Sequence, residues 1–283
     1  MQGPLIEVDA LAERLRTPGW VVVDCRFDLR DPQAGRAAYA RGHIAGARYA
    51  DLDRDLSRPP RPGEGRHPLP DPGDFAARLG AWGIDEDTAV VAYDADGGAV
   101  AARLWWLLRW LRHERAYVLN GGIQAWQRAG LPLETNAPTW QPARYPARAP
   151  RAEWVVATAD VAREQARGAL LVDARAAARY RGEQEPIDPV AGHVPGARNW
   201  PFAQSLGPDA RFRPAAELAA DLEAFIGGRP SREVIAMCGS GVTACHLLLA
   251  LSGAGLGDGR LYAGSWSEWI RDPARPVRTG EEP

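Results

Sequence analysis

The sequence predicts an α/β protein made of two similar domains, each a mainly parallel sheet with helices on both faces. The first observation is an internal repeat: residues 21–26 (VVVDCR) resemble residues 170–175 (LLVDAR), and residues 42–47 (GHIAGA) resemble residues 192–197 (GHVPGA). The second is the alternation of short apolar runs with helical patterns in each half. Such alternation is typical of parallel sheets, in which functional residues lie at the carboxyl ends of strands.

Two further matches keep the order of the repeat. Residues 90–94 (VVAYD) resemble residues 234–238 (VIAMC), and the Gly and Trp that begin and end residues 121–126 recur in residues 264–269. Because all four matches follow one another at nearly constant spacing, we expect two copies of one folding unit.

Each half supplies strands and helices in turn. Short apolar and β-branched runs predict strands at 20–23, 89–93, 116–119, 170–172 and 233–237. Helical patterns predict helices at 8–16, 74–82, 99–111, 215–225 and 244–251. The run at 99–111 is the most apolar, but it is too short to span a membrane and predicts a helix facing the core.

Prolines set the boundary between the halves. They recur between residues 132 and 150, where they predict a semi-extended linker that cannot be helical. The expected organisation is an N-terminal domain at 1–135, a linker at 136–150 and a C-terminal domain at 151–283.

Composition excludes several classes of partner. The net charge is -2 and the basic residues are scattered, so we expect no nucleic acid and no membrane as partner, whereas a small anionic substrate fits. Residues 1–7 lack a secretory pattern, which predicts a cytoplasmic protein. The 3 Cys show no metal-ligand spacing, and we expect neither a metal nor an organic cofactor.

Cys238 is the candidate nucleophile. It follows the strand predicted at 233–237 and precedes Gly239, Ser240 and Gly241, after which a helix begins. Two glycines allow this turn to curl with its N–H groups inward, and the helix N-terminus adds positive charge, so the turn favours a thiolate. The alternative is an inert buried thiol, which is how we interpret Cys25 and Cys245.

The loop CGSGVTA at 238–244 resembles the active-site loop of the 3-mercaptopyruvate sulfurtransferases of the tandem rhodanese family. The two GH-x-x-GA segments, the two D-x-R segments and GSWSEW at 264–269 resemble the same family, so that the likeness covers nearly the whole chain. The resemblance implies two rhodanese-like domains, of which only the C-terminal one is catalytic. Asp94, in the place of Cys238 in the first repeat, agrees with this.

Cysteine phosphatases and arsenate reductases use a similar loop, but they need an Arg that closes it and clamps a tetrahedral oxyanion. Ala244 and Cys245 stand at that point here, which argues against this class.

The resemblance also implies roles for residues near the nucleophile. Ser240 is either a proton relay or a small turn residue, and the relay would include His43, with Asp31 as the acidic member. His193 occupies the place of His43 in the other repeat, so a shared structural role is the alternative.

Substrate contacts are expected from Arg179 and from the loop residues listed here: Gly239, Gly241, Val242 and Thr243. Arg179 matches the family's carboxylate-binding Arg, and a guanidinium suits a carboxylate. A second Arg often found in mercaptopyruvate-using relatives is missing at 186–189 (PIDP). Asp24 with Arg26, and Asp173 with Arg175, are expected to form structural ion pairs.

The expected reaction is transfer of sulfane sulfur from 3-mercaptopyruvate to a thiol or cyanide through a Cys238 persulfide. Thiosulfate is the alternative donor. It is a dianion, and the neutral Gly239 and Ser240 after the nucleophile suit it less than a monocarboxylate. A thioredoxin-like reductant is a possible partner. The alternative of another class is a non-catalytic persulfide carrier, which steady-state turnover of small donors would distinguish from an enzyme.

Overall fold

The computed structural model describes residues 3–146 and 148–283, which divide into two compact units. Of the described residues, the first unit takes those within Met1–Arg58, Leu69–Arg151 and Pro208–Phe212. The second takes Pro59–Pro68, Ala152–Gly207 and Arg213–Pro283. The chain therefore changes units near residue 151, and one short segment of each half belongs to the other unit.

A five-stranded parallel sheet lies at the centre of the first unit, in the order β1-β5-β4-β2-β3. Its strands are β1 (Leu5–Ile6), β2 (Trp20–Asp24), β3 (Arg48–Tyr49), β4 (Ala89–Tyr93) and β5 (Ala116–Leu119). The strands predicted at 20–23, 89–93 and 116–119 are thus confirmed. The central strands β2 and β4 are almost wholly buried, which explains their continuous apolar sequence.

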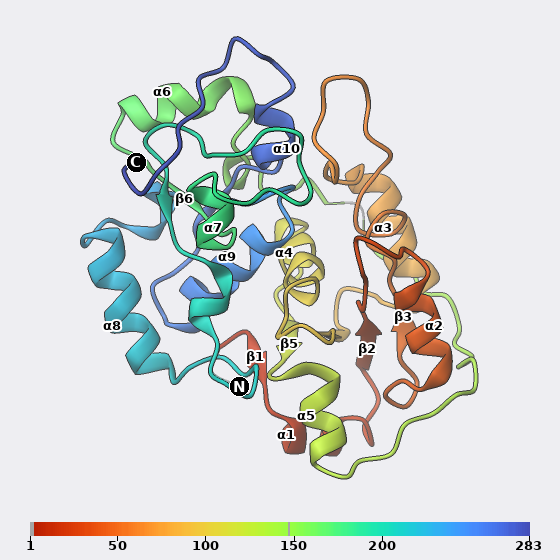
Figure 1. Cartoon of the computed structure of the whole chain (residues 1–283). Helices are drawn as coiled ribbons and strands as arrows, with labels where there is room; N and C mark the ends of the chain where they lie inside the picture. The colour runs from red at the N-terminus through yellow and green to blue at the C-terminus, as the bar shows by residue number, and fades with distance from the viewer. Residues whose placement is uncertain (1–2, 147) are drawn as a thin grey trace. The chain divides into compact units, whose positions relative to one another are not determined.

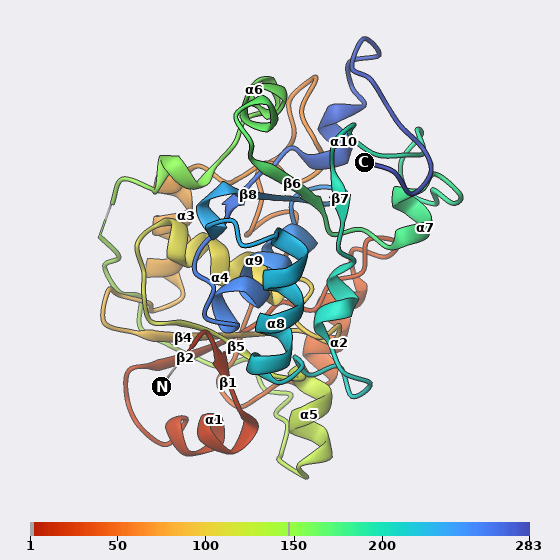
Figure 2. The ribbon, with the colours of Figure 1, turned by 90° about the vertical axis from the view of Figure 1, so that its left-hand side faces the viewer.

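Helices cover both faces of this sheet. They are α1 (Val8–Arg14), α2 (Ala34–Arg41), α3 (Pro72–Ala81), α4 (Ala101–Trp110) and α5 (Gly122–Arg128). Figure 2 shows α3 and α4 on one side of the strands and α1 and α5 on the other. The helix α4 lies within the predicted 99–111 and is buried nearly all round. Among the described residues, no helix is long and apolar enough to cross a membrane.

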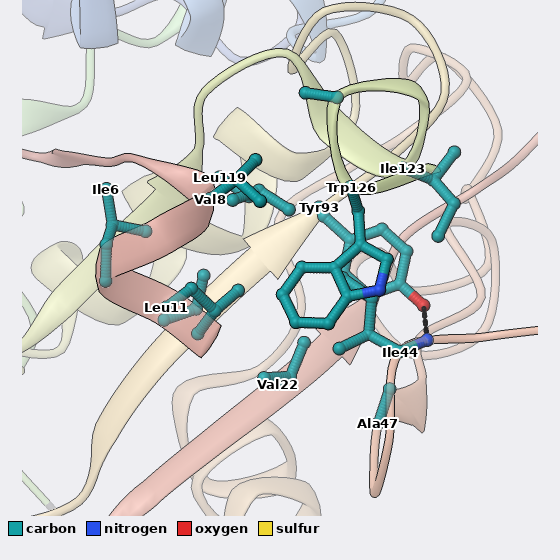
Figure 3. Close-up of a cluster of buried hydrophobic side chains, with 12 residues drawn as sticks. Ile6, Val8, Leu11, Val22, Ile44, Ala47, Tyr93, Leu119, Ile123 and Trp126 are labelled. Carbon is teal, nitrogen blue, oxygen red and sulfur yellow. Dashed lines mark hydrogen bonds between the residues drawn. The ribbon is translucent and has the colours of Figure 1, made fainter. Parts of the chain in front are cut away.

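Alternate residues of β2 and β4 build the core beneath α1 and α5. Val22, Val91 and Tyr93 belong to one buried cluster with Leu11 and Trp126 (Figure 3). The Tyr93 ring spans the cluster, and its hydroxyl accepts a hydrogen bond from Ile44 N at 3.2 Å. The side chains that alternate with these face α3 and α4, as the period of two in a strand requires.

The second unit repeats the same architecture. Its four-stranded parallel sheet has the order β7-β6-β8-β9, matching β3-β2-β4-β5. The strands are β6 (Leu170–Asp173), β7 (Arg198–Asn199), β8 (Val234–Met237) and β9 (Arg260–Leu261). A parallel bridge of Val155 to Leu261 takes the place of β1. The predicted strand at 233–237 begins one residue later than expected, because Glu233 ends a 3-10 turn.

The helices of this unit again cover both faces. They are α6 (Val161–Ala166), α7 (Ala177–Tyr180), α8 (Ala215–Ile226), α9 (Thr243–Gly253) and α10 (Ser265–Trp269), with 3-10 turns η1 (Ala152–Trp154), η2 (Thr158–Asp160), η3 (Phe202–Ser205) and η4 (Ser231–Glu233). Figures 1 and 2 show their order along the chain, and Figure 2 places α6 and α8 on opposite sides of β6. The predicted two-domain α/β fold is confirmed.

A buried ion pair recurs at the same corner of both units. Arg26 donates to Asp24 and to the Gly42 carbonyl, whereas Arg175 donates to Asp173 and to the Gly192 carbonyl. Each pair joins the end of a central strand to the turn that precedes the edge strand. The structural role expected for these pairs is confirmed.

The proline-rich segment 136–150 contains no helix in its described residues and lies against the first unit. Trp140 Nε1 donates to the Ala81 carbonyl at 2.7 Å, and Ala143 N donates to the Gly80 carbonyl at 2.9 Å. A Cβ on Gly80 would lie only 2.7 Å from the Ala143 carbonyl oxygen, so glycine allows this approach. Residues 136–150 therefore pack against the C-terminal end of α3.

Candidate active site

Cys238 lies directly after β8, in the turn that leads into α9. Its side chain is buried, at 2% exposure, and its Sγ accepts a hydrogen bond from Gly241 N at 3.2 Å. Gly241 has φ 77°, and a Cβ there would lie 2.5 Å from the Ala263 carbonyl oxygen. The turn can therefore curl around the sulfur only with glycine at this position. Val242 precedes α9 and Thr243 begins it, at the positive end of the helix.

The segment 264–269 holds this loop from behind. The Ser265 hydroxyl accepts from Cys238 N at 3.1 Å and donates to the Tyr262 carbonyl. Trp266 N donates to the Cys238 carbonyl at 3.0 Å, and Ser267 N to the Gly239 carbonyl at 2.8 Å. Both carbonyls of the loop are thereby turned toward α10, which leaves the other side of the loop for the reacting groups.

The first unit shows what such a loop does with an anion. Asp94 follows β4 as Cys238 follows β8, and its buried carboxylate accepts four backbone N–H groups at 2.8 to 2.9 Å. The donors are Asp96, Gly98, Val100 and Ala101. The N–H groups of the loop after β4 thus bind the carboxylate of the loop's own Asp94. This loop has Asp94 where the second unit has Cys238.

Ser240 is joined to a residue that the sequence analysis missed. The Ser240 hydroxyl and His67 Nδ1 form a hydrogen bond of 2.7 Å, with 7% and 4% of the two residues exposed. His67 lies in the segment 59–68, which belongs to the second unit. Unlike His43 and His193, His67 has no counterpart in the repeat, but this alone does not single it out.

His43 and Asp31, the residues suggested for the relay, make structural contacts within the first unit. His43 Nδ1 donates to the Tyr39 carbonyl at 2.9 Å, and its fully buried ring stacks on Tyr39 at 4.0 Å. His193 makes the same contacts with Tyr180, at 2.8 and 3.8 Å. Asp31 is exposed, and its carboxylate accepts from Gln33 N in the turn before α2.

Arg179 lies in α7 with its guanidinium beside the cysteine loop. A Cβ on Gly239 would lie 3.6 Å from both terminal nitrogens of Arg179 and 3.0 Å from Arg66 Nη2. The loop itself is neutral, as expected, but its surroundings are not, since two guanidinium groups border Gly239. A neutral loop therefore does not by itself explain why a monocarboxylate donor would be preferred. The acidic side chains that pair with these two arginines also have to be considered.

Two buried carboxylates hold Arg179. Glu185 accepts from Arg179 Nε at 3.0 Å, and Asp188 accepts from Arg179 Nη2 at 3.0 Å. Burial raises the pKa of Glu185, but the hydrogen bond and charge of Arg179 and the N–H groups of Asp188 and Ile187 together lower it by more, so that the pKa is lowered overall. Glu185 is therefore ionised at neutral pH and fixes the guanidinium in place.

The other two cysteines are buried, and neither forms a disulfide with a described residue. Burial, followed by the charges of Asp24, Asp94 and Asp55, raises the pKa of Cys25 well above its usual range. Cys245 donates its thiol proton to the Gly241 carbonyl at 3.3 Å, within α9. These contacts agree with the inert role expected for both.

The family model for the rhodanese-like domain matches residues 7–129 and 157–272. The chain belongs to the rhodanese family. Each matched range covers one sheet with its helices, so this rhodanese contains two copies of the domain.

Relatives of this rhodanese match over nearly their whole length. A protein of Pseudomonas aeruginosa named "Probable 3-mercaptopyruvate sulfurtransferase" is 51% identical over 280 residues, 98% of each chain. The thiosulfate sulfurtransferase of Bos taurus is 35% identical over 282 residues, 94% of this chain and 91% of the relative.

Solved structures give the same result. The 3-mercaptopyruvate sulfurtransferase of Leishmania major has a TM-score of 0.85 at 32% identity, covering 96% of this chain and 76% of that one. SseA of Escherichia coli has a TM-score of 0.77 at 33% identity, covering 94% of this chain and 99% of that one.

Proposed function

We propose that this rhodanese is a sulfurtransferase that takes sulfur from 3-mercaptopyruvate and carries it on Cys238 as a persulfide. The observation that carries the proposal is the group of Cys238, Ser240 and His67: a thiol in an N–H-lined loop, two residues from a hydroxyl hydrogen-bonded to a buried imidazole. That the relatives named above include mercaptopyruvate and thiosulfate sulfurtransferases supports this reaction class.

The first half-reaction forms one S–S bond and breaks one C–S bond. The Cys238 thiolate attacks the sulfur of mercaptopyruvate, and the electron pair of the C–S bond passes to the donor's carbon, which leaves as the enolate of pyruvate. The donor's thiol proton balances the charge when it reaches that enolate. The products are pyruvate and a Cys238 persulfide, whose outer sulfur we expect the N–H groups of Gly239, Gly241, Val242 and Thr243 to stabilise. The hydrogen bond from Gly241 N to the Cys238 Sγ supports this.

Ser240 and His67 provide a proton path for this step. The enolate needs one proton as it leaves, and the Ser240 hydroxyl supplies it while taking one from the imidazole to which it is hydrogen-bonded. The donor's thiol proton then restores the imidazole, so that the net transfer is from the donor's sulfur to its carbon. Arg179 holds the donor's carboxylate with Nη1, a terminal nitrogen beside Gly239 to which Glu185 and Asp188 are not hydrogen-bonded.

The second half-reaction returns Cys238 to the thiolate. An acceptor thiol or cyanide attacks the outer sulfur of the persulfide and leaves as a new persulfide or as thiocyanate. A thioredoxin-like reductant as the thiol acceptor, and a cytoplasmic location, are the finer proposals that follow from the sequence.

Thiosulfate is the second candidate donor, because two guanidinium groups beside Gly239 also suit an anion of higher charge. A donor panel on the purified protein separates the two. We expect kcat/KM for mercaptopyruvate to exceed that for thiosulfate by at least about tenfold, the worth of one charge-assisted contact and a proton relay. Faster turnover of thiosulfate at equal concentration would make thiosulfate the donor.

The role of Arg179 is tested in the same panel. We expect Arg179→Ala to raise KM for mercaptopyruvate about tenfold while changing kcat less, because the carboxylate contact is present in both ground and transition state. An unchanged KM would exclude this contact.

A further inference from the structure

The chain just before His67 is bound to α10 by two consecutive backbone N–H groups. Gly65 N donates to Glu268 Oε2 at 3.2 Å. Arg66 N donates to the Ser267 hydroxyl at 3.0 Å. The next residue is His67, so these two acceptors on α10 determine where its backbone lies.

Glycine at position 65 allows the chain to lie this close to α10. Gly65 is buried, and a Cβ there would lie 2.6 Å from the Gly264 carbonyl oxygen and 2.9 Å from the Ser267 Oγ. The acceptor Glu268 is held in turn, because its Oε1 accepts a hydrogen bond from the Thr158 hydroxyl. Since Gly65 meets backbone atoms at this point, the segment has little room to shift.

Ser267 contacts the chain on both sides of the Ser240–His67 pair. Its N–H donates to the Gly239 carbonyl at 2.8 Å, and its hydroxyl accepts from Arg66 N. Gly239 directly precedes Ser240, and Arg66 directly precedes His67. The hydrogen bond of 2.7 Å between Ser240 and His67 therefore closes a ring that runs through Ser267, which is itself buried, at 2% exposure.

We propose that Ser267 is a positioning residue, which sets the His67 imidazole at hydrogen-bond distance from the Ser240 hydroxyl. This rests on the proposed function, since the proton relay that Ser267 serves belongs to that reaction. A proton passes between two groups only within hydrogen-bond reach, and a misplacement of about 1 Å costs up to about a hundredfold in rate. Glu268 supports the same segment one residue earlier.

The test makes Ser267→Ala in the full-length protein and again in a His67→Gln background. The change removes the acceptor of Arg66 N but keeps the N–H that holds Gly239. In the wild-type background it should lower the saturating rate of pyruvate release from mercaptopyruvate about tenfold, with the half-saturating concentration changed less than about twofold. In His67→Gln, which has no imidazole to position, it should lower that rate less than about twofold.

Ser231→Ala is the matched control. Ser231 is also a buried serine of the second unit, but it lies before β8, whereas the cysteine loop follows β8, and its hydroxyl donates to the Leu256 carbonyl. We expect it to behave as wild type. Glu268→Ala should act in the same direction as Ser267→Ala, and Glu268→Gln should keep most of the rate, because an amide oxygen can still accept from Gly65 N.

The imidazole nitrogen NMR resonances of His67 report its hydrogen bond with no donor present. We expect them to shift in Ser267→Ala and to stay in place in Ser231→Ala. Unchanged His67 resonances, or an equal loss of rate in the wild-type and His67→Gln backgrounds, would overturn the inference. If the wild type releases no pyruvate from mercaptopyruvate, the proposed function fails instead, and the His67 resonances still decide the role of Ser267.

Discussion

At the scale of single residues, the three thiols have different surroundings, and this predicts where sulfur is bound. Incubated with donor and no acceptor, the wild type, Cys25→Ser and Cys245→Ser should each gain the mass of one sulfur atom. The Cys238 Sγ accepts the Gly241 N–H of the loop, whereas burial raises the pKa of Cys25 and keeps it a thiol. Intact-protein mass spectrometry measures this. Turnover and sulfur gain in Cys238→Ser would refute the assignment.

The Ser240–His67 hydrogen bond predicts a donor-dependent defect. Ser240→Ala and His67→Gln should each lower kcat for mercaptopyruvate by about a hundredfold, because its enolate leaving group needs a proton. Thiosulfate serves as the control donor, since sulfite leaves without one, and its kcat should fall much less. Stopped-flow measurement of pyruvate release gives the rate of the first half-reaction. Equal defects with both donors would mean that the pair only supports the loop.

At the scale of elements, the loop after β4 has Asp94 in the place of Cys238, and this carboxylate stabilises the fold. The carboxylate of Asp94 satisfies four N–H groups that would otherwise be buried without an acceptor. Asp94→Asn places an NH2 group against two of these donors and should lower the free energy of unfolding by about 2 to 4 kcal/mol. Urea denaturation measures the change, with Asp87→Asn as an exposed control. If Asp94→Asn lowers the free energy of unfolding no more than the control does, the N–H groups of this loop do not need a charged acceptor.

The sequence predicted the long elements well and the short ones poorly, for a physical reason. The strands β2, β4, β5, β6 and β8 are buried apolar runs, and the helices α1, α3, α4, α8 and α9 have a clear apolar face, so their composition marks them. The strands β3, β7 and β9 have only two residues each, and α7 has four. Their positions depend on tertiary contacts, such as the Asp173–Arg175 pair, that no local pattern reveals.

The candidate site divides in the same way. Cys238 was predictable because loop, strand and helix are contiguous in the sequence. His67 and Arg66 were not, because they lie 171 and 172 residues before Cys238 in a proline-rich loop whose partners are Ser240, Ser267 and Asp188. His67 lacks a counterpart in the repeat, but so do His113 and His246, and this signal therefore does not single it out.

At the scale of the whole molecule, the two compact units do not coincide with the two halves of the sequence. The segment 59–68 of the N-terminal half belongs to the second unit, where Gly65 packs against the Gly264 carbonyl and Glu268. In the reverse sense, the segment 208–212 belongs to the first unit, where Phe212 N donates to Asn120 at 2.8 Å. The second unit is therefore incomplete when the chain is cut at the sequence boundary.

This exchange predicts the behaviour of a truncated protein. A fragment of residues 151–283 keeps Cys238, Ser240 and Arg179 but lacks the segment that carries Arg66 and His67. We expect its kcat/KM for mercaptopyruvate to fall at least as far as in the full-length variant His67→Gln, about a hundredfold. Circular dichroism establishes whether the fragment is folded, and sulfur loading of Cys238 separates loss of chemistry from loss of structure. A folded fragment with full activity would show that the segment 59–68 contributes nothing to the reaction, and the relay through His67 would then be wrong.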